Sequence, residues 1–334
     1  MIMSNPGFAL RFPFRPLHWV SGVEEPIQFW RDGTEVSLSA SPPYLVLRAE
    51  PFESEEAAAS YLPRLWGAVA WMAVRVGTGF VAEMTVDSVT YANDAEAAAA
   101  NLTQSIGLPN RGPVHGIVNG NFPSILPLGK NIRFITAGEP SVSQTLSKAL
   151  VEAPLKEGLQ ADGAGELYGD ERLRTAIELF CDSHRESSVR SKFLTLAMAI
   201  EVLTQPASKH AVAQQLLDAL QENVERGLAT HAVGSEEWHA LDSLKRELFF
   251  RRDNSIRSRV RTLVLTALSG VEDAERGRLA RDAVWVYDLR GKLVHDGTAP
   301  KSDLSRGYGL ARSLLMQLLA ARMRFACAQE GLGA

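Results

Sequence analysis

Short apolar runs separated by turns dominate the first 140 residues, and their spacing predicts strands. These runs lie at residues 8–14, 27–40, 44–52 and 131–138. Asp32 and Gly33 interrupt the second run, and this pair predicts a tight hairpin because glycine tolerates positive φ. Residues 80–92 are interpreted as a further strand pair, and the Gly-rich residues 108–129 as a loop.

Two stretches with helical periodicity lie among these strands. Residues 57–77 repeat apolar side chains every three or four positions, after an acidic first turn at residues 53–56. Pro63 marks either the true start of this helix or a kink in it. Residues 95–107 suit a short second helix that ends at Gly107. We therefore expect an α+β domain over residues 1–140.

The second half of the chain has helical periodicity almost throughout. About seven apolar–polar segments follow Gly165, joined by short polar turns, and Asp170 stands at the start of the first in an N-cap position. Such a pattern predicts an all-α helical bundle over residues 165–330. Pro154 and Gly158 mark residues 141–164 as the link between the two domains.

Composition narrows the classes of function. The 334 residues suffice for two domains, and a net charge of −4 argues against a protein that coats nucleic acid generally, while a local basic patch remains compatible. Cys181 and Cys327 lie too far apart for a metal motif, so we expect a cytoplasmic protein without metal or cofactor. The N-terminus lacks the apolar core of a signal peptide, and no apolar run predicts a membrane span.

The segment that ends near Gly297 carries a candidate catalytic pair, Arg290 and His295. In a continuous helix these two positions are about 140° apart. Gly297 and Pro300 predict a helix end, so that His295 can turn back towards Arg290. A guanidinium beside an imidazole suits metal-free RNA cleavage, which needs phosphate binding and proton transfer near neutral pH. The alternative is capping, since the helix dipole alone favours both residues there.

Three segments in order carry a family resemblance: Lys192–Pro206 with its Ala-x-Glu step, the basic–apolar Ser255–Leu265, and Val284–Gly297 with its Tyr-Asp-x-Arg…His-x-Gly end. Together they resemble the HEPN superfamily, most closely its Apea-like branch, over about half the chain. The resemblance implies a helical bundle that dimerises with its motifs facing. It also implies a metal-independent endoribonuclease, or an RNA-binding relative, of toxin, antiviral defence or stress systems. Gly291 departs from the polar residue usual in active members.

Five further residues are candidates around the pair. Glu201 lies among apolar neighbours and must be paired or protonated, so it either orients the catalytic pair or forms a salt bridge that fixes helix register. Tyr287 is expected in the core or at its rim, and Asp288 either at the surface or paired with an arginine. Arg257 and Arg261 share a helical face and form either a phosphate-binding patch for RNA or a solvated surface.

These observations lead to two functional hypotheses. The first is a HEPN-type endoribonuclease or RNA-binding protein that forms a homodimer through its helical domain, with no membrane or metal partner. The alternative is a non-catalytic dimerisation module whose N-terminal domain binds a ligand or partner protein. Apposed and solvent-open Arg–His sites favour the first hypothesis, and a dry contact favours the second.

Overall fold

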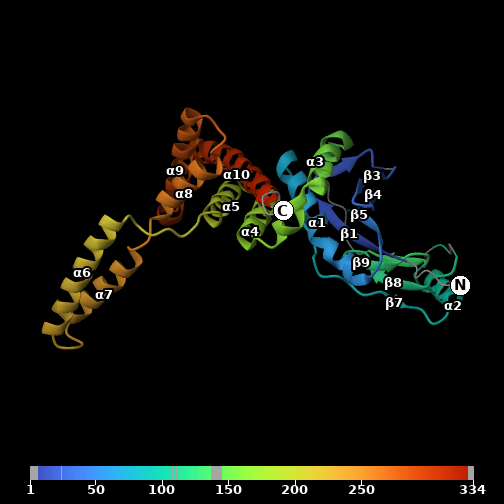
Figure 1. Cartoon of the computed structure of the whole chain (residues 1–334), viewed down its shortest axis with the longest axis horizontal. Coiled ribbons are helices and arrows are strands. Elements are labelled where there is room, and N and C mark those ends of the chain that lie inside the picture. Colours follow the sequence, from blue (N-terminus) through green and yellow to red (C-terminus); the bar gives the residue numbers. More distant parts are fainter. Residues whose placement is uncertain (1–6, 24, 107–108, 110–111, 137–144, 330–334) are drawn as a thin grey trace. The chain divides into compact units, whose positions relative to one another are not determined.

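The structure is a computed structural model that describes residues 7–23, 25–106, 109, 112–136 and 145–329. It divides into two compact units, of which unit 1 contains residues 1–195 and 319–334 and unit 2 contains residues 196–318. A β-rich region followed by seven helices, α4 to α10 in the described part of the chain, confirms the expected order of an α+β region and a helical region. The boundary between the units falls inside helices α5 and α10 (Figure 1).

A largely antiparallel sheet forms the centre of unit 1, with the strand order β3-β4-β5-β1-β6 and β9 also paired to β1. Its strands are β1 (Phe8–Pro16), β3 (Ile27–Arg31), β4 (Thr34–Ser41), β5 (Tyr44–Phe52), β6 (Phe80–Ala82) and β9 (Ser124–Pro127). The predicted hairpin is confirmed, because β3 and β4 pair across Asp32 and Gly33. These residues have φ values of 50° and 80°, as the two central positions of a type I′ turn require.

Two smaller sheets complete unit 1. They contain β7 (Thr90–Tyr91), β8 (Gly116–Asn119) and β10 (Ile132–Ile135) in one, and β2 (Trp19–Ser21) and β11 (Thr145–Ser147) in the other. The prediction of a loop over residues 108–129 is therefore wrong, since this range contains β8 and β9. Each of these strands has only four residues, too few for a clear alternation, and each is stabilised by partners distant in the sequence. Residues 80–92 contain two strands as predicted, but β6 and β7 do not pair with each other. Instead, β6 pairs with β1 and β7 pairs with β8.

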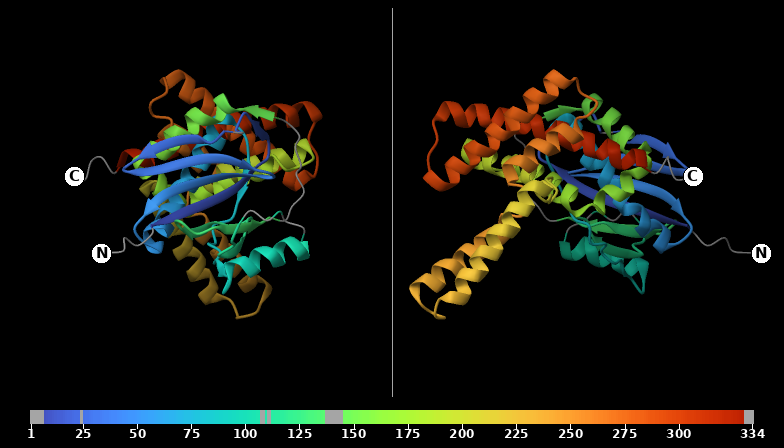
Figure 2. Two further views of the ribbon diagram at one scale, coloured as in Figure 1. Left: turned by 90° about the vertical axis from the view of Figure 1, so that its right-hand side faces the viewer. Right: turned by 60° about the vertical axis from the view of Figure 1, so that its left-hand side comes forward.

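Helix α1 (Glu55–Val76) packs on the sheet of unit 1 (Figure 2). The Ser54 side chain accepts a hydrogen bond from the Ala57 backbone N–H and caps the start of the helix. The helix continues through Pro63, so this proline is not the start. Its buried side chains, which pack against the sheet, α3 and η1, include Leu62, Leu65, Trp66, Val69 and Met72.

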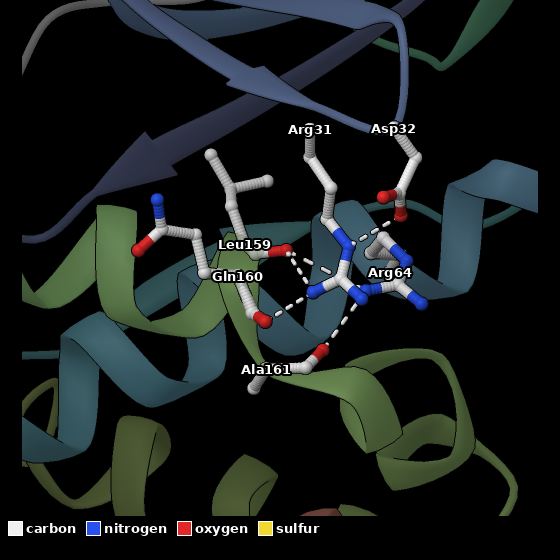
Figure 3. Close-up of polar contacts among 6 residues, drawn as sticks. All are labelled: Arg31, Asp32, Arg64, Leu159, Gln160 and Ala161. Carbon is white, nitrogen blue, oxygen red and sulfur yellow. Dashed lines mark hydrogen bonds and ion pairs between the residues drawn. The ribbon is translucent and has the colours of Figure 1, made fainter.

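Residues 148–160, expected to lie in a linker, form helix α3 (Lys148–Gln160) packed on α1. Gly158 permits the close approach, since a Cβ there would lie 2.8 Å from the Cα of Ala68 on α1. Two arginines bond the last carbonyls of α3: Arg64 Nη1 donates to Ala161 O at 2.9 Å, and Arg31 Nη1 donates to Leu159 O and Gln160 O (Figure 3). These contacts satisfy carbonyls that a helix end leaves unpaired. Residues 141–144 of the expected linker lie outside the described residues.

The remaining helices are α2 (Ala95–Ile106), the 3₁₀ helix η1 (Asp162–Tyr168), α4 (Glu171–Ser183), α5 (Val189–Val202), α6 (Ala211–Thr230), α7 (Glu236–Phe250), α8 (Ile256–Ala267), α9 (Asp273–Asp296) and α10 (Lys301–Gln329). Asp170 caps α4 as predicted, accepting from the Leu173 N–H at 3.0 Å. The predicted end of α2 at Gly107 lies outside the described residues. The division into units assigns α4 to unit 1 and the helices α6 to α9 to unit 2.

None of the helices in the described ranges is both long enough and apolar enough to cross a membrane. Cys181 is buried in α4, and burial raises the pKa of its thiol to about 12. The side chain of Cys327 lies outside the part of the chain that is described.

Candidate functional site

Helix α9 carries both members of the predicted catalytic pair. It runs without a break from Asp273 to Asp296, and Gly297 ends it with a φ of 71°. This left-handed conformation confirms the predicted C-terminal signal. The helix is therefore regular through Arg290 and His295, and helical geometry sets the direction of both side chains.

Arg290 lies on the buried face of α9. The side chains of that face recur at helical spacing and include Leu279, Ala283, Val286 and Leu293. At about 100° per residue, Arg290 lies within about 40° of both Ala283 and Val286 around the helix axis. Its side chain is 28% exposed, and its Nε lies 3.2 Å from Oε1 of Glu201 on α5. The Arg290 guanidinium therefore points towards the core of unit 2.

His295 lies on the exposed face of α9, about 140° around the axis from Arg290. The expected return of His295 towards Arg290 does not occur within one chain, because the last turn stays helical as far as Asp296. The structure thus brings Arg290 together with Glu201 and leaves His295 at the surface. A site that combines the two groups is not formed by this helix alone.

The contact between Glu201 and Arg290 is a half-buried ion pair, and Glu201 also borders a narrow crevice. The Glu201 side chain is 19% exposed, and neither Oε1 nor the Arg290 Nε has a partner in hydrogen-bond geometry within the described residues. Burial raises the pKa of Glu201, and the Arg290 charge opposes that shift. The crevice, bordered also by Ala197, Ile200 and Val260, leaves no room for a water molecule. Of the two interpretations of Glu201, these features favour a salt bridge that fixes the packing of α5 on α9.

A surface pocket of about 410 Å³ lies between α8 and α9, and we call it the α8–α9 groove. It is lined by Arg257, Arg261, Ala280, Arg281, Val284, Trp285 and Asp288. Arg257 and Arg261 are four residues apart and project from one face of α8. Three guanidinium groups therefore surround an apolar floor that contains one indole ring, with one carboxylate among the lining residues.

Two contacts organise the groove. Arg257 Nε donates to both carboxylate oxygens of Asp288, at 3.0 and 3.2 Å, so Asp288 is both exposed and paired with an arginine, the two alternatives that its position left open. Arg306 of α10 lies over the Trp285 ring, with its Cζ 4.8 Å from the centroid. Arg257 and Asp288 remain 59% and 47% exposed, so this ion pair can exchange its partner for a ligand.

The exposed face of α9 extends the groove towards the end of the helix. Arg281, Trp285, Asp288, Lys292 and His295 follow one another at intervals of three or four residues, which places them on one side of α9. Four of them are exposed, and Trp285 is half-buried. His295 therefore shares a face with the basic groove and not with Arg290. We call these five residues the α9 stripe.

Three members of this arrangement were missed by sequence reasoning: Arg281, Lys292 and Trp285. The signal was present as a helical repeat of polar and aromatic positions opposite the apolar face. Arg306 had no such signal, because it reaches Trp285 from another helix.

Tyr287 and Gly291 lie outside the groove lining. Tyr287 is half-buried and borders the crevice beside Glu201, as expected of a rim residue. A Cβ at Gly291 would meet nothing within 4 Å, so the absence of a side chain there is not imposed by packing.

Among the described residues there is no group of three or more His, Cys, Asp or Glu side chains that could hold a metal ion. Comparison of the chain with family models, with curated proteins and with solved structures gave no match. The α8–α9 groove and the α9 stripe are therefore the features of the described residues that bear most directly on function.

Proposed function

We propose that the helical half of this chain is a HEPN-like RNA-binding module, and that the α8–α9 groove holds single-stranded RNA. The observation that carries this proposal is the groove itself, in which Arg257, Arg261 and Arg281 surround Trp285. This local excess of positive charge occurs in a chain with a formal charge of −4. A basic patch of this kind acts on a ligand locally, whatever the net charge of the protein.

Each part of the groove suits one part of a nucleotide. Guanidinium groups bind phosphate oxygens through charge-assisted, often paired, hydrogen bonds. The apolar floor with its indole ring suits a base, since base–aromatic stacking contributes about 1–3 kcal/mol per base and tolerates any sequence. An RNA phosphate would displace Asp288 from Arg257 at small cost, because both partners are well exposed.

Metal-independent cleavage, implied by the resemblance, is the second candidate function, and the position of His295 favours it. An exposed imidazole on the same face as the groove is a group that can act as a general acid or base towards an RNA backbone. In this proposal Arg290 is a positioning residue that holds α9 against α5 through Glu201. Binding without cleavage is the alternative, and the half-buried Glu201–Arg290 ion pair favours it, because it holds the Arg290 guanidinium on the opposite side of α9 from the groove.

RNA binding is tested by fluorescence anisotropy with a labelled oligouridylate and the purified full chain. We expect Arg257→Ala/Arg261→Ala to raise Kd about 10-fold or more, since each variant position removes a phosphate contact. Arg246→Ala is the matched control, because Arg246 is an exposed arginine of α7 that pairs with Asp242 and does not line the groove. Failure of the wild-type chain to bind, or an equal Kd for the double variant and the control, contradicts the proposal.

Cleavage is tested on the same RNA with a chelator present. A protein that cuts RNA should lose the activity in His295→Ala while keeping its anisotropy signal. Arg290→Ala should lose activity together with thermal stability. Intact RNA with the wild-type protein, alongside normal binding, selects the non-catalytic alternative.

A further inference from the structure

Helices α6 and α7 form an antiparallel hairpin with almost no interior of its own. Arg252 pairs with Asp218 near its base, and Lys245 Nζ lies 3.0 Å from Glu225 Oε1 further along, which defines the antiparallel alignment. Residues 211–250 are all described, and within this range Val224 is the one buried side chain. A helix pair of this length needs more apolar burial than this to be stable by itself.

One side of the hairpin exposes a row of aliphatic side chains. The row consists of Val212, Leu216 and Leu220 of α6, which are 60%, 64% and 50% exposed, and Leu244 of α7, which is 43% exposed. The half-buried Leu217 and Leu248 lie between the two helices. Leu216 precedes Leu217 on α6, and Leu244 precedes Leu248 on α7, so each is rotated in the same sense about its own helix axis, away from the interior leucine. Because the two helices are antiparallel, this rotation places Leu216 and Leu244 on the same face of the hairpin. We call the four exposed residues the hairpin face.

Charge is unevenly distributed along the hairpin. The distal half, residues 219–242, has five carboxylates and one arginine. The basal half, residues 209–218 and 243–252, has five Lys and Arg residues and two carboxylates. The hairpin is thus acidic towards its tip and basic towards its base.

We propose that the hairpin face binds the hairpin face of a second copy of this chain, with the two hairpins antiparallel about a two-fold axis. The contact buries the aliphatic row of both copies and forms a four-helix bundle. A two-fold axis across the middle of the face places the acidic tip of one hairpin beside the basic base of the other. A parallel arrangement would instead bring like charges together, so charge selects both the partner and its direction.

This interface does not depend on RNA, so its failure and the failure of the RNA-binding proposal are separate results. It also extends the expected homodimer by assigning a surface that lies outside the α8–α9 groove and the α9 stripe.

Analytical ultracentrifugation of the full chain over a range of micromolar concentrations tests the proposal. The wild type should sediment as a dimer, and Leu216→Asp should raise the dimer dissociation constant about 100-fold or more, because a charge would enter the centre of an apolar contact. Ala229→Asp is the matched control, since it adds the same charge to an exposed position on the other side of α6. Far-UV circular dichroism checks that both variants keep their helices.

A charge-swap experiment tests the orientation and covers the case in which Leu216→Asp fails to fold. Glu236→Lys/Glu237→Lys should weaken the dimer, and mixing that variant with Arg251→Glu should restore association as a heterodimer. A monomeric wild type, or a Leu216→Asp dimer as tight as the wild type, overturns the proposed face. Charge variants that associate like the wild type and do not prefer each other overturn the antiparallel arrangement.

Discussion

Replacing Arg290 with alanine should destabilise unit 2, whereas replacing His295 with alanine should not. Removing one partner from a fully buried ion pair costs about 3–5 kcal/mol, because the other charge is left without compensation. Here the two side chains are 28% and 19% exposed, so we expect a cost of about 2 kcal/mol for Arg290→Ala and for Glu201→Ala. His295 is exposed in the last turn of α9, and His295→Ala should change stability by less than about 0.5 kcal/mol near neutral pH.

The stability of the double variant Glu201→Leu/Arg290→Met shows whether the single variants lose stability because one charge is left unpaired or because side-chain packing is lost. Burial already disfavours the ionised form of Glu201 more than Arg290 favours it, as the raised pKa of Glu201 indicates. Replacing both charges with apolar side chains removes this desolvation cost, so the double variant should lie within about 1 kcal/mol of the wild type.

Urea titrations followed by far-UV circular dichroism give the free energies of unfolding, with separate transitions fitted for units that unfold separately. Equal stabilities of Arg290→Ala and His295→Ala would refute the placement of Arg290 on the buried face of α9. Additive losses in the double variant would refute the coupling of the two charges.

Three further predictions concern pH, a helix cap and a turn. Burial in the folded state raises the pKa of Glu201, so its contribution to stability is complete below the carboxyl's ordinary pKa and is lost as pH rises through the raised value. Glutamine resembles the protonated carboxyl at every pH, so the unfolding free energy of the wild type minus that of Glu201→Gln should fall as pH increases from about 4 towards neutrality, and a difference that rises with pH would contradict this sign. Arg64→Ala should cost about 1–2 kcal/mol in unit 1 by leaving Ala161 O without its donor, while the exposed control Arg48→Ala should cost far less in the same urea titration. Gly297→Ala should lower the stability of unit 2 by about 1 kcal/mol, because alanine is strained at a φ of 71°, and an unchanged calorimetric transition would show that the α9 end relaxes freely.

Local signals in the sequence predicted the features whose cause is local. Asp32–Gly33 predicted its hairpin, Asp170 its helix cap and Gly297 the end of α9, because each depends on the conformation of one or two residues. Strands β8 and β9 were not predictable in this way, since each is short and depends on pairing that no local signal marks: β9 pairs with β1, far away in the chain, and β8 pairs in parallel with β10.

Helix α3 shows why tertiary contacts can reverse a local signal. Pro154 and Gly158 indicated a linker, but Gly158 lies where α3 passes close to α1, and a side chain there would collide with Ala68. The same glycine that breaks an isolated helix thus permits the packing of this one.

The candidate site was predictable in its residue types and only partly in its arrangement. The apolar phase of α9 was available in the sequence, and it places Arg290 inwards and His295 outwards. The helix-ending signal at Gly297 does not reverse this phase, because the helix stays regular up to Asp296 and His295 keeps its helical position. The Glu201–Arg290 ion pair and the Arg306–Trp285 contact join separate helices, so no local pattern could identify the partners.

The salt dependence of RNA binding tests the central claim most directly. For the wild-type chain the logarithm of the association constant for oligouridylate should fall linearly with the logarithm of salt concentration. In Arg257→Ala/Arg261→Ala the slope should be shallower by about 1–2, since one phosphate contact is lost for each arginine removed. A slope identical to that of the wild type and of the Arg246→Ala control would show that RNA does not enter the α8–α9 groove.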